Sequence, residues 1–184
     1  MSIDTIKRQI PDFAKDLRIN LGNVLDHEQA GDMSENQLWA TALATALASR
    51  NKTLIEAVAA EASNHLDAQW MSAARSAAAI MGMNNIYYRF LHLASNDEYA
   101  KMPAKLRMTV IGNPGIDKVD FELLSLAVSA INGCGMCIDS HEKVLKQGGV
   151  SAGTIQHAVR IASVMHAVAG VLDTAEIPAL QAAA

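Results

Sequence analysis

Cysteine, proline and aromatic residues are all scarce in this chain of 184 residues. With two cysteines, the chain does not use disulfides as scaffolding, and a core of this size does not need them. Aromatic residues make up 4% of the chain, whereas alanine is its most frequent residue. Small apolar side chains on good helix formers favour closely packed helices over sheets. The composition therefore predicts an all-α protein, and the length predicts a single domain over residues 1–184.

An excess of positive charge is absent as well. The net charge is -4, so no basic surface is expected to neutralise the phosphates of nucleic acid. The longest run without a charged residue, 123–138, is shorter than the roughly 20 residues that a membrane span needs. Residues 1–5 lack the basic and then apolar pattern of a secretory signal. We therefore expect a cytoplasmic protein that binds neither nucleic acid nor membranes.

Caps, breakers and apolar periodicity predict where the helices lie. Ser34 and Gln37 have the spacing of a capping box for a helix that starts at Glu35. Residues 20–34 read as a polar connection, and Leu106–Ile111 carries a weak strand signal. In the first half, helices are expected at about 4–19, where Pro11 is a point of division, from 35 onwards, at 53–65 and at 67–93. In the second half, they are expected from 117 or 120 to 132, at 134–147 and from 151 onwards.

The two halves of the chain are similar to each other. When Gln37 and Leu38 are aligned with Glu122 and Leu123, Arg75 falls on Arg160 in the same register. This match predicts two related helical halves.

Both cysteines lie in one motif, Cys134-Gly-Met-Cys137, and His141 follows four residues later. On a helix these three residues share one face. Two thiols at this spacing interconvert between dithiol and disulfide, and a neighbouring imidazole stabilises a reactive thiolate. We expect Cys134 at the start of its helix, where free backbone N–H groups favour negative charge. In a cytoplasmic protein such a pair is reduced at rest and forms a disulfide during turnover.

A carboxylate is expected beside the histidine. Asn132-Gly133 permits a tight turn between two antiparallel helices, which predicts a catalytic hairpin over about 117–148. Reflection about this turn places Glu122 opposite residue 143, only ~3 Å of helix rise from His141. A glutamate that orients a histidine, which activates a cysteine, forms a relay. Cys137 is the better candidate for activation because it is one helical turn from His141.

Structural explanations compete with each of these assignments. The cysteines and His141 supply three zinc ligands, whereas a closed structural site needs four. The other histidines show no second paired spacing and are expected to pack or to lie on the surface; they are His27, His65, His92, His157 and His166. Glu122 alone would also stabilise the helix dipole, and His141 alone would fit a helix surface. The nine methionines are expected to fill the core.

Three stretches of the chain resemble the alkyl hydroperoxidase AhpD family: Asn113–His141, Met81–Asn85 and Asp12–Leu21. The resemblance implies an all-helical fold of the carboxymuconolactone decarboxylase-like type, assembled as a homotrimer. It also implies an antioxidant thiol peroxidase without bound cofactor or metal. Its implied electron donor is the dihydrolipoyl group of a lipoylated dihydrolipoamide acyltransferase, and its implied partner is the peroxiredoxin AhpC.

The resemblance also assigns roles to residues. Cys137 would be the peroxidatic cysteine, which becomes a sulfenic acid, and Cys134 the proton donor and resolving thiol that closes the Cys134–Cys137 disulfide. Glu122 and His141 would form the proton relay that deprotonates Cys137. One position departs from the family pattern: Met136 stands between the cysteines where a family member has histidine.

Three functions remain open from the sequence. The leading one is a dithiol peroxidase that reduces organic hydroperoxides. The second is a carboxymuconolactone decarboxylase-type lyase on the same fold, which would use His141 and Glu122 without redox cycling. The third is a redox-sensing or zinc-binding adaptor.

Overall fold

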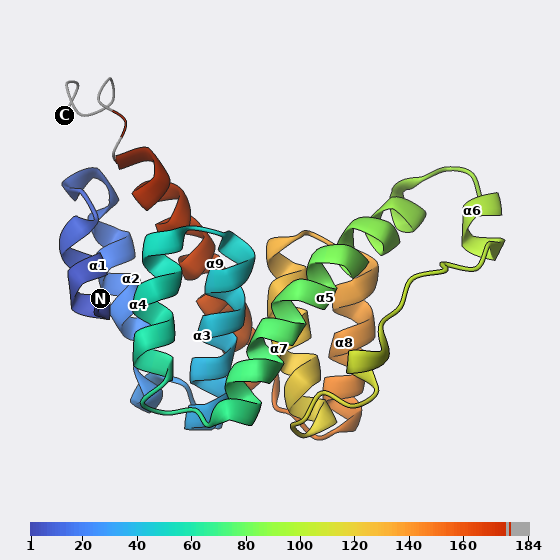
Figure 1. Ribbon diagram of the computed structural model, residues 1–184, viewed down its shortest axis with the longest axis horizontal. Helices are drawn as coiled ribbons and strands as arrows, with labels where there is room; N and C mark the ends of the chain where they lie inside the picture. Colours follow the sequence, from blue (N-terminus) through green and yellow to red (C-terminus); the bar gives the residue numbers. More distant parts are fainter. Residues whose placement is uncertain (176, 178–184) are drawn as a thin grey trace.

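The described residues of the computed structural model, 1–175 and 177, form helices and connections without a strand (Figure 1). The all-α prediction is confirmed. The helices are α1 (Ile3–Gln9), α2 (Lys15–Val24), α3 (Glu35–Ser49), α4 (Lys52–Ala62), α5 (Ala68–Leu93), α6 (Glu98–Lys101), α7 (Lys118–Ile131), α8 (Gly135–Gln147) and α9 (Ala152–Ala175). Short 3₁₀ turns cover Asp12–Ala14, His27–Gln29 and Thr109–Ile111.

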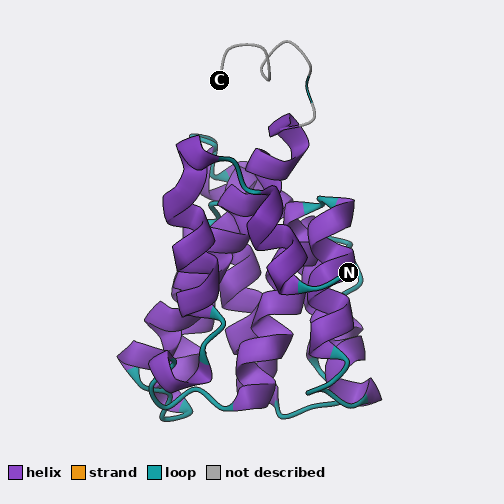
Figure 2. Ribbon diagram, turned by 90° about the vertical axis from the view of Figure 1, so that its left-hand side faces the viewer, coloured by secondary structure: helices purple, strands orange, loops and turns teal. Residues whose placement is uncertain are grey.

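Helix α3 lies at the centre of the helical packing. It contacts α4, α5, α7 and α9, and all its residues from Leu38 to Ala46 are buried. Helix α7 joins it in the core, with Phe121 and the residues from Leu123 to Ser129 buried. Figure 1 shows α1, α2 and α4 on one side of α3, α7 and α8 on the other side, and α5 running from the lower end of α3 across α7 towards α6. The connections lie mostly at the two ends of the bundle (Figure 2).

Local capping explains most helix starts. The expected capping box of α3 is present, with Ser34 and Gln37 each accepting a hydrogen bond from the other's backbone N–H. The side chains of Asn51, Asp67 and Asp117 cap α4, α5 and α7 by accepting hydrogen bonds from backbone N–H groups of the first turn. These polar residues therefore fix where the apolar helices enter the core.

Two expectations from the sequence are wrong. The stretch 4–19 is divided around Pro11, as expected, but α2 continues to Val24, so residues 20–24 are helical rather than part of the polar connection expected over 20–34. Burial of Leu21 and Val24 stabilises this extension. The weak strand signal at Leu106–Ile111 corresponds to irregular backbone and a 3₁₀ turn, because no neighbouring strand pairs with it in the described part of the chain.

The helices of the two halves repeat in order and in length. Helices α3, α4 and α5 have 15, 11 and 26 residues, and α7, α8 and α9 have 14, 13 and 24. This repetition agrees with two related helical halves.

Helix α9 is the one described helix that is long and apolar enough to cross a membrane. Half of its most apolar window is buried inside the protein. It packs against α2, α3 and α7 and contributes Ile161, Met165 and Val168 to the hydrophobic core. These contacts are those of a core helix.

Asp120, a carboxylate of α7, faces α3. Asp120 Oδ1 accepts a hydrogen bond from Gln37 Nε2 on α3 at 2.7 Å. Burial raises the pKa of Asp120; the bond from Gln37 opposes this effect and repulsion from Asp117 adds to it. The folded state therefore holds this proton more tightly than the unfolded chain. The contribution of Asp120 to the free energy of unfolding is therefore fully present below the unfolded pKa of about 3.8. It is lost as the pH rises through the raised pKa of the folded state.

Replacing Asp120 by Asn should remove this dependence, because the amide does not ionise and its oxygen still accepts from Gln37. We expect the free energy of unfolding at pH 7 to rise by less than about 1 kcal/mol, since the carboxyl is partly solvated. The measurement is urea unfolding between pH 4 and pH 7, with the exposed Asp32→Asn as the control. An Asp120→Asn curve with the same pH dependence as the wild type would contradict the assignment.

Candidate active site

A glycine turn joins α7 to α8. Gly133 has φ of +64°, a left-handed conformation that L side chains rarely adopt. Its N–H donates to the Ala130 carbonyl, and the N–H of Cys134 donates to the Ser129 carbonyl, both at 3.2 Å. These two bonds form a Schellman motif that ends α7. Cys134 then serves as the N-cap residue of α8, which gives the expected hairpin.

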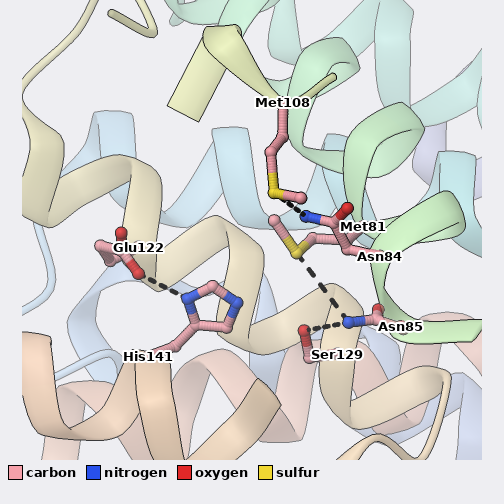
Figure 3. Close-up of polar contacts among 7 residues, drawn as sticks. All are labelled: Met81, Asn84, Asn85, Met108, Glu122, Ser129 and His141. Atoms are coloured by element: carbon pink, nitrogen blue, oxygen red, sulfur yellow. Dashed lines mark hydrogen bonds and ion pairs between the residues drawn. The ribbon is translucent and has the colours of Figure 1, made fainter. Parts of the chain in front are cut away.

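Side chains from α5 hold this turn in place. Asn85 Nδ2 donates to Ser129 Oγ at 2.8 Å (Figure 3). Asn132 Nδ2 in turn donates to Asn85 Oδ1 at 2.9 Å. Arg89 Nη1 donates to the Asn132 carbonyl at 2.5 Å. The start of α8 is therefore fixed against α5 by a partly buried polar network as well as by the turn.

The two cysteines differ in their access to solvent. They form a disulfide in this structure, with their Cα atoms 5.2 Å apart. Cys134 has no exposed surface, and its side chain makes no capping hydrogen bond. Cys137, in the first turn of α8, is 7% exposed. Of the two, Cys137 is the sulfur that a small molecule reaches.

Glu122 and His141 meet as the spacing predicted. His141 Nδ1 lies 2.5 Å from Glu122 Oε2, and their side chains are 12% and 17% exposed. Because a carboxylate only accepts, Nδ1 carries the proton of this bond. Among the described residues none forms a hydrogen bond with Nε2, which faces the side where Met81 and Asn84 lie (Figure 3). The carboxylate thus orients the ring and leaves Nε2 available for chemistry.

A cavity of about 370 Å³ connects these groups. Its polar wall includes Cys137, His141 and Glu122, and its remaining surface is mainly apolar. The lining residues are Met81, Asn84, Tyr88, Met108, Ile111, Glu122, Met136, Cys137, Ser140, His141 and Val144. Such a site suits a ligand with one polar reacting end and an apolar body.

The sequence analysis did not assign the α5 and loop residues of this cavity to the site, although the stretch Met81–Asn85 contributed to the family resemblance. Met81 is buried in the core, as expected, and also lines the cavity. Met108 and Met136 line the cavity and do not belong to the buried core cluster, so the expectation that the methionines fill the core is wrong for these two. Asn84 and Asn85 did carry a signal. Asparagine is unfavourable inside helices, so two in succession in a long predicted helix indicate a role for their side chains.

The other histidines have structural partners or lie outside the cavity. His65 stacks on Trp39 with ring centroids 4.7 Å apart and contacts Glu35, while His157 hydrogen-bonds to the Val24 carbonyl. Within residues 1–175 and 177, no cluster of three or more His, Cys, Asp or Glu side chains is arranged to hold a metal ion.

Comparison with known proteins identifies the family. Residues 97–179 match the carboxymuconolactone decarboxylase family. The chain is 60% identical over 169 residues to alkyl hydroperoxide reductase AhpD of Rhodopseudomonas palustris, covering 92% of each protein. It is 56% identical over 173 residues to the protein of that name from Rhodospirillum centenum, covering 94% of this chain and 91% of the relative. It is also 56% identical over 176 residues to the Brucella anthropi protein of the same name, covering 96% of this chain and 99% of the relative. The chain belongs to the AhpD family, as its motifs predicted.

Proposed function

We propose that this protein is an antioxidant alkyl hydroperoxide reductase that uses Cys134 and Cys137 as a redox pair. The observation that carries the proposal is the position of Cys137, in one cavity with a histidine that a carboxylate holds at 2.5 Å. An activated thiol in a partly apolar cavity suits an organic hydroperoxide. The name of the relatives, alkyl hydroperoxide reductase, supports the same reaction.

The first step oxidises Cys137. His141, oriented by Glu122, takes the thiol proton of Cys137 through water. The thiolate attacks the terminal oxygen of the hydroperoxide, and the O–O bond breaks. Its electron pair stays on the alkyl oxygen, which takes a proton from the Cys134 thiol and leaves as an alcohol. Cys137 is then a sulfenic acid, oxidised by two electrons.

The second step closes the disulfide. The Cys134 thiolate attacks the sulfenic sulfur of Cys137, the S–O bond breaks, and the departing hydroxide takes the proton from His141 to form water. We propose that dihydrolipoyl groups of a lipoylated dihydrolipoamide acyltransferase reduce this disulfide, and that the protein in turn reduces an AhpC-type peroxiredoxin. The reaction needs no bound cofactor because the two cysteines carry both electrons.

We also propose a cytoplasmic homotrimer. The end of α5 and the arm that carries α6 project from the other helices in Figure 1. Several large apolar side chains in this part of the chain are exposed. The exposed residues are Ile86, Phe90, Leu93, Tyr99 and Met102. Contact with other copies of the chain would remove this apolar surface from water. A monomer in sedimentation equilibrium at micromolar concentration would rule out the trimer.

The decisive experiment is hydroperoxide consumption coupled to lipoamide, dihydrolipoamide dehydrogenase and NADH. We expect turnover with cumene hydroperoxide that depends on lipoamide. The Cys137→Ser variant should be inactive, whereas a carboxymuconolactone decarboxylase-type lyase would keep its own activity in that variant. Absence of lipoamide-dependent turnover in the wild type would refute the proposed electron donor, and absence of any thiol oxidation by the hydroperoxide would refute the reaction.

The roles of the cysteines are separated by trapping. In Cys134→Ser, Cys137 should form a sulfenic acid that a dimedone probe labels, because no thiol is left to resolve it. Mass spectrometry locates the label within the CxxC peptide. A label on Cys134 in the reciprocal variant Cys137→Ser would show that the roles are reversed.

The relay is tested by removing either partner. Glu122→Gln and His141→Gln should each slow hydroperoxide consumption by ~10²-fold, the usual contribution of general-base catalysis. The double variant should be little slower than either single variant, since the two residues act as one unit. Unchanged rates in both single variants would exclude the relay.

A further inference from the structure

Asn84 is a buried amide that the protein leaves without a strong partner. It lies on α5, is 4% exposed and lines the cavity that contains Cys137 and His141. Its Oδ1 is buried and accepts no hydrogen bond from the described residues. Its Nδ2 donates only to Met108 Sδ, at 3.6 Å, and a thioether is a weak acceptor. Buried polar groups in proteins are normally satisfied, so this amide requires an explanation.

The next residue in the chain provides the comparison. Asn85 is also buried, but its Nδ2 donates to Ser129 and its Oδ1 accepts from Asn132. Its role is structural, because it anchors the turn before Cys134. Asn84 makes no such contacts and faces the cavity, next to the sulfur atoms of Met81 and Met108 and across from the His141 ring (Figure 3).

We propose that Asn84 binds the alkyl oxygen of the hydroperoxide and stabilises the charge that develops there; the inference rests on the proposed function. When the Cys137 thiolate attacks the terminal oxygen, the electron pair of the breaking O–O bond moves to the alkyl oxygen. A preorganised N–H at this oxygen stabilises the transition state until the oxygen is protonated. Nδ2 of Asn84 exchanges its weak contact with Met108 for this stronger one.

Asn84 suits this role better than the other neutral donors of the cavity. These are the hydroxyls of Tyr88, which is partly buried, and Ser140, which is exposed. A donor shielded from water stabilises developing charge more strongly than a solvated one. In the proposed reaction His141 Nε2 takes the proton of Cys137, and the Cys134 thiol later protonates the alkyl oxygen. Asn84 supplies the hydrogen bond that stabilises the charge on this oxygen before that proton arrives. Asn84 is therefore assigned as a catalytic residue that contacts substrate.

The test is the variant Asn84→Leu, which keeps the number and branching of the side-chain heavy atoms and removes both hydrogen-bonding groups. In a single turnover of the pre-reduced protein with cumene hydroperoxide, we expect the rate to fall about ten- to a hundredfold, the effect of one lost transition-state hydrogen bond. Alkylation of Cys137 by iodoacetamide should stay within about twofold of the wild type, because that reaction develops no charge on oxygen. The melting temperature should not fall, since an unsatisfied buried polar group is replaced by an apolar one.

The matched control is Asn85→Leu, which should lower the melting temperature because it breaks the network at the Asn132 turn. If Asn84→Leu fails to fold, Asn84→Ala is measured in the same three assays. A hydroperoxide rate within twofold of the wild type, or an equal slowing of alkylation, would overturn the role of Asn84. A wild-type protein that does not react with the hydroperoxide would refute the proposed function instead, so the two failures are distinguishable.

Discussion

The geometry of the candidate site depends on the backbone conformation of Gly133. Its φ of +64° lets α7 end and α8 begin within a short turn, so the two helices run back along each other. Glu122 lies about 16 Å before this glycine along α7, and His141 lies about 12 Å after it along α8. The two side chains are long enough to bridge the difference of about 4 Å between these positions along the paired helices. A longer turn would change the register and separate the acid from the ring.

Helix α7 uses its two carboxylates in opposite directions. Asp120 and Glu122 are separated by one residue, so their side chains leave the helix about 200° apart. One faces α3, where Gln37 binds it, and the other faces α8, where His141 binds it. Asp120 lies in the first turn of α7, where the helix dipole favours negative charge, and Glu122 lies in the next turn. One carboxylate thus joins α7 to α3, and the other orients a histidine of α8.

Much of this arrangement was predictable because its determinants are local. Capping residues such as Ser34, the turn at Asn132-Gly133 and the helical spacing of Cys137 and His141 depend on close neighbours in the sequence. The errors have long-range causes: burial of Leu21 extends α2, and the absence of a partner strand leaves Leu106–Ile111 irregular. The cavity was not predictable from the CxxC motif alone, because α5 and the loop at Met108, both distant from the motif in the sequence, complete it.

The two halves of the chain show why the chemistry lies in only one of them. The register that aligns Gln37 with Glu122 places Ser49, Lys52 and Glu56 where the second half has Cys134, Cys137 and His141. In the first half the short second helix begins with a strong cap, since Asn51 Oδ1 accepts from the Leu54 N–H at 2.8 Å. In the second half Cys134 occupies the N-cap of α8 and makes no such bond. Giving up a polar cap costs about 1 kcal/mol, and it leaves the free N–H groups of the first turn beside the reactive sulfurs. The protein therefore gives up local stability at the position where its proposed chemistry requires an electropositive environment.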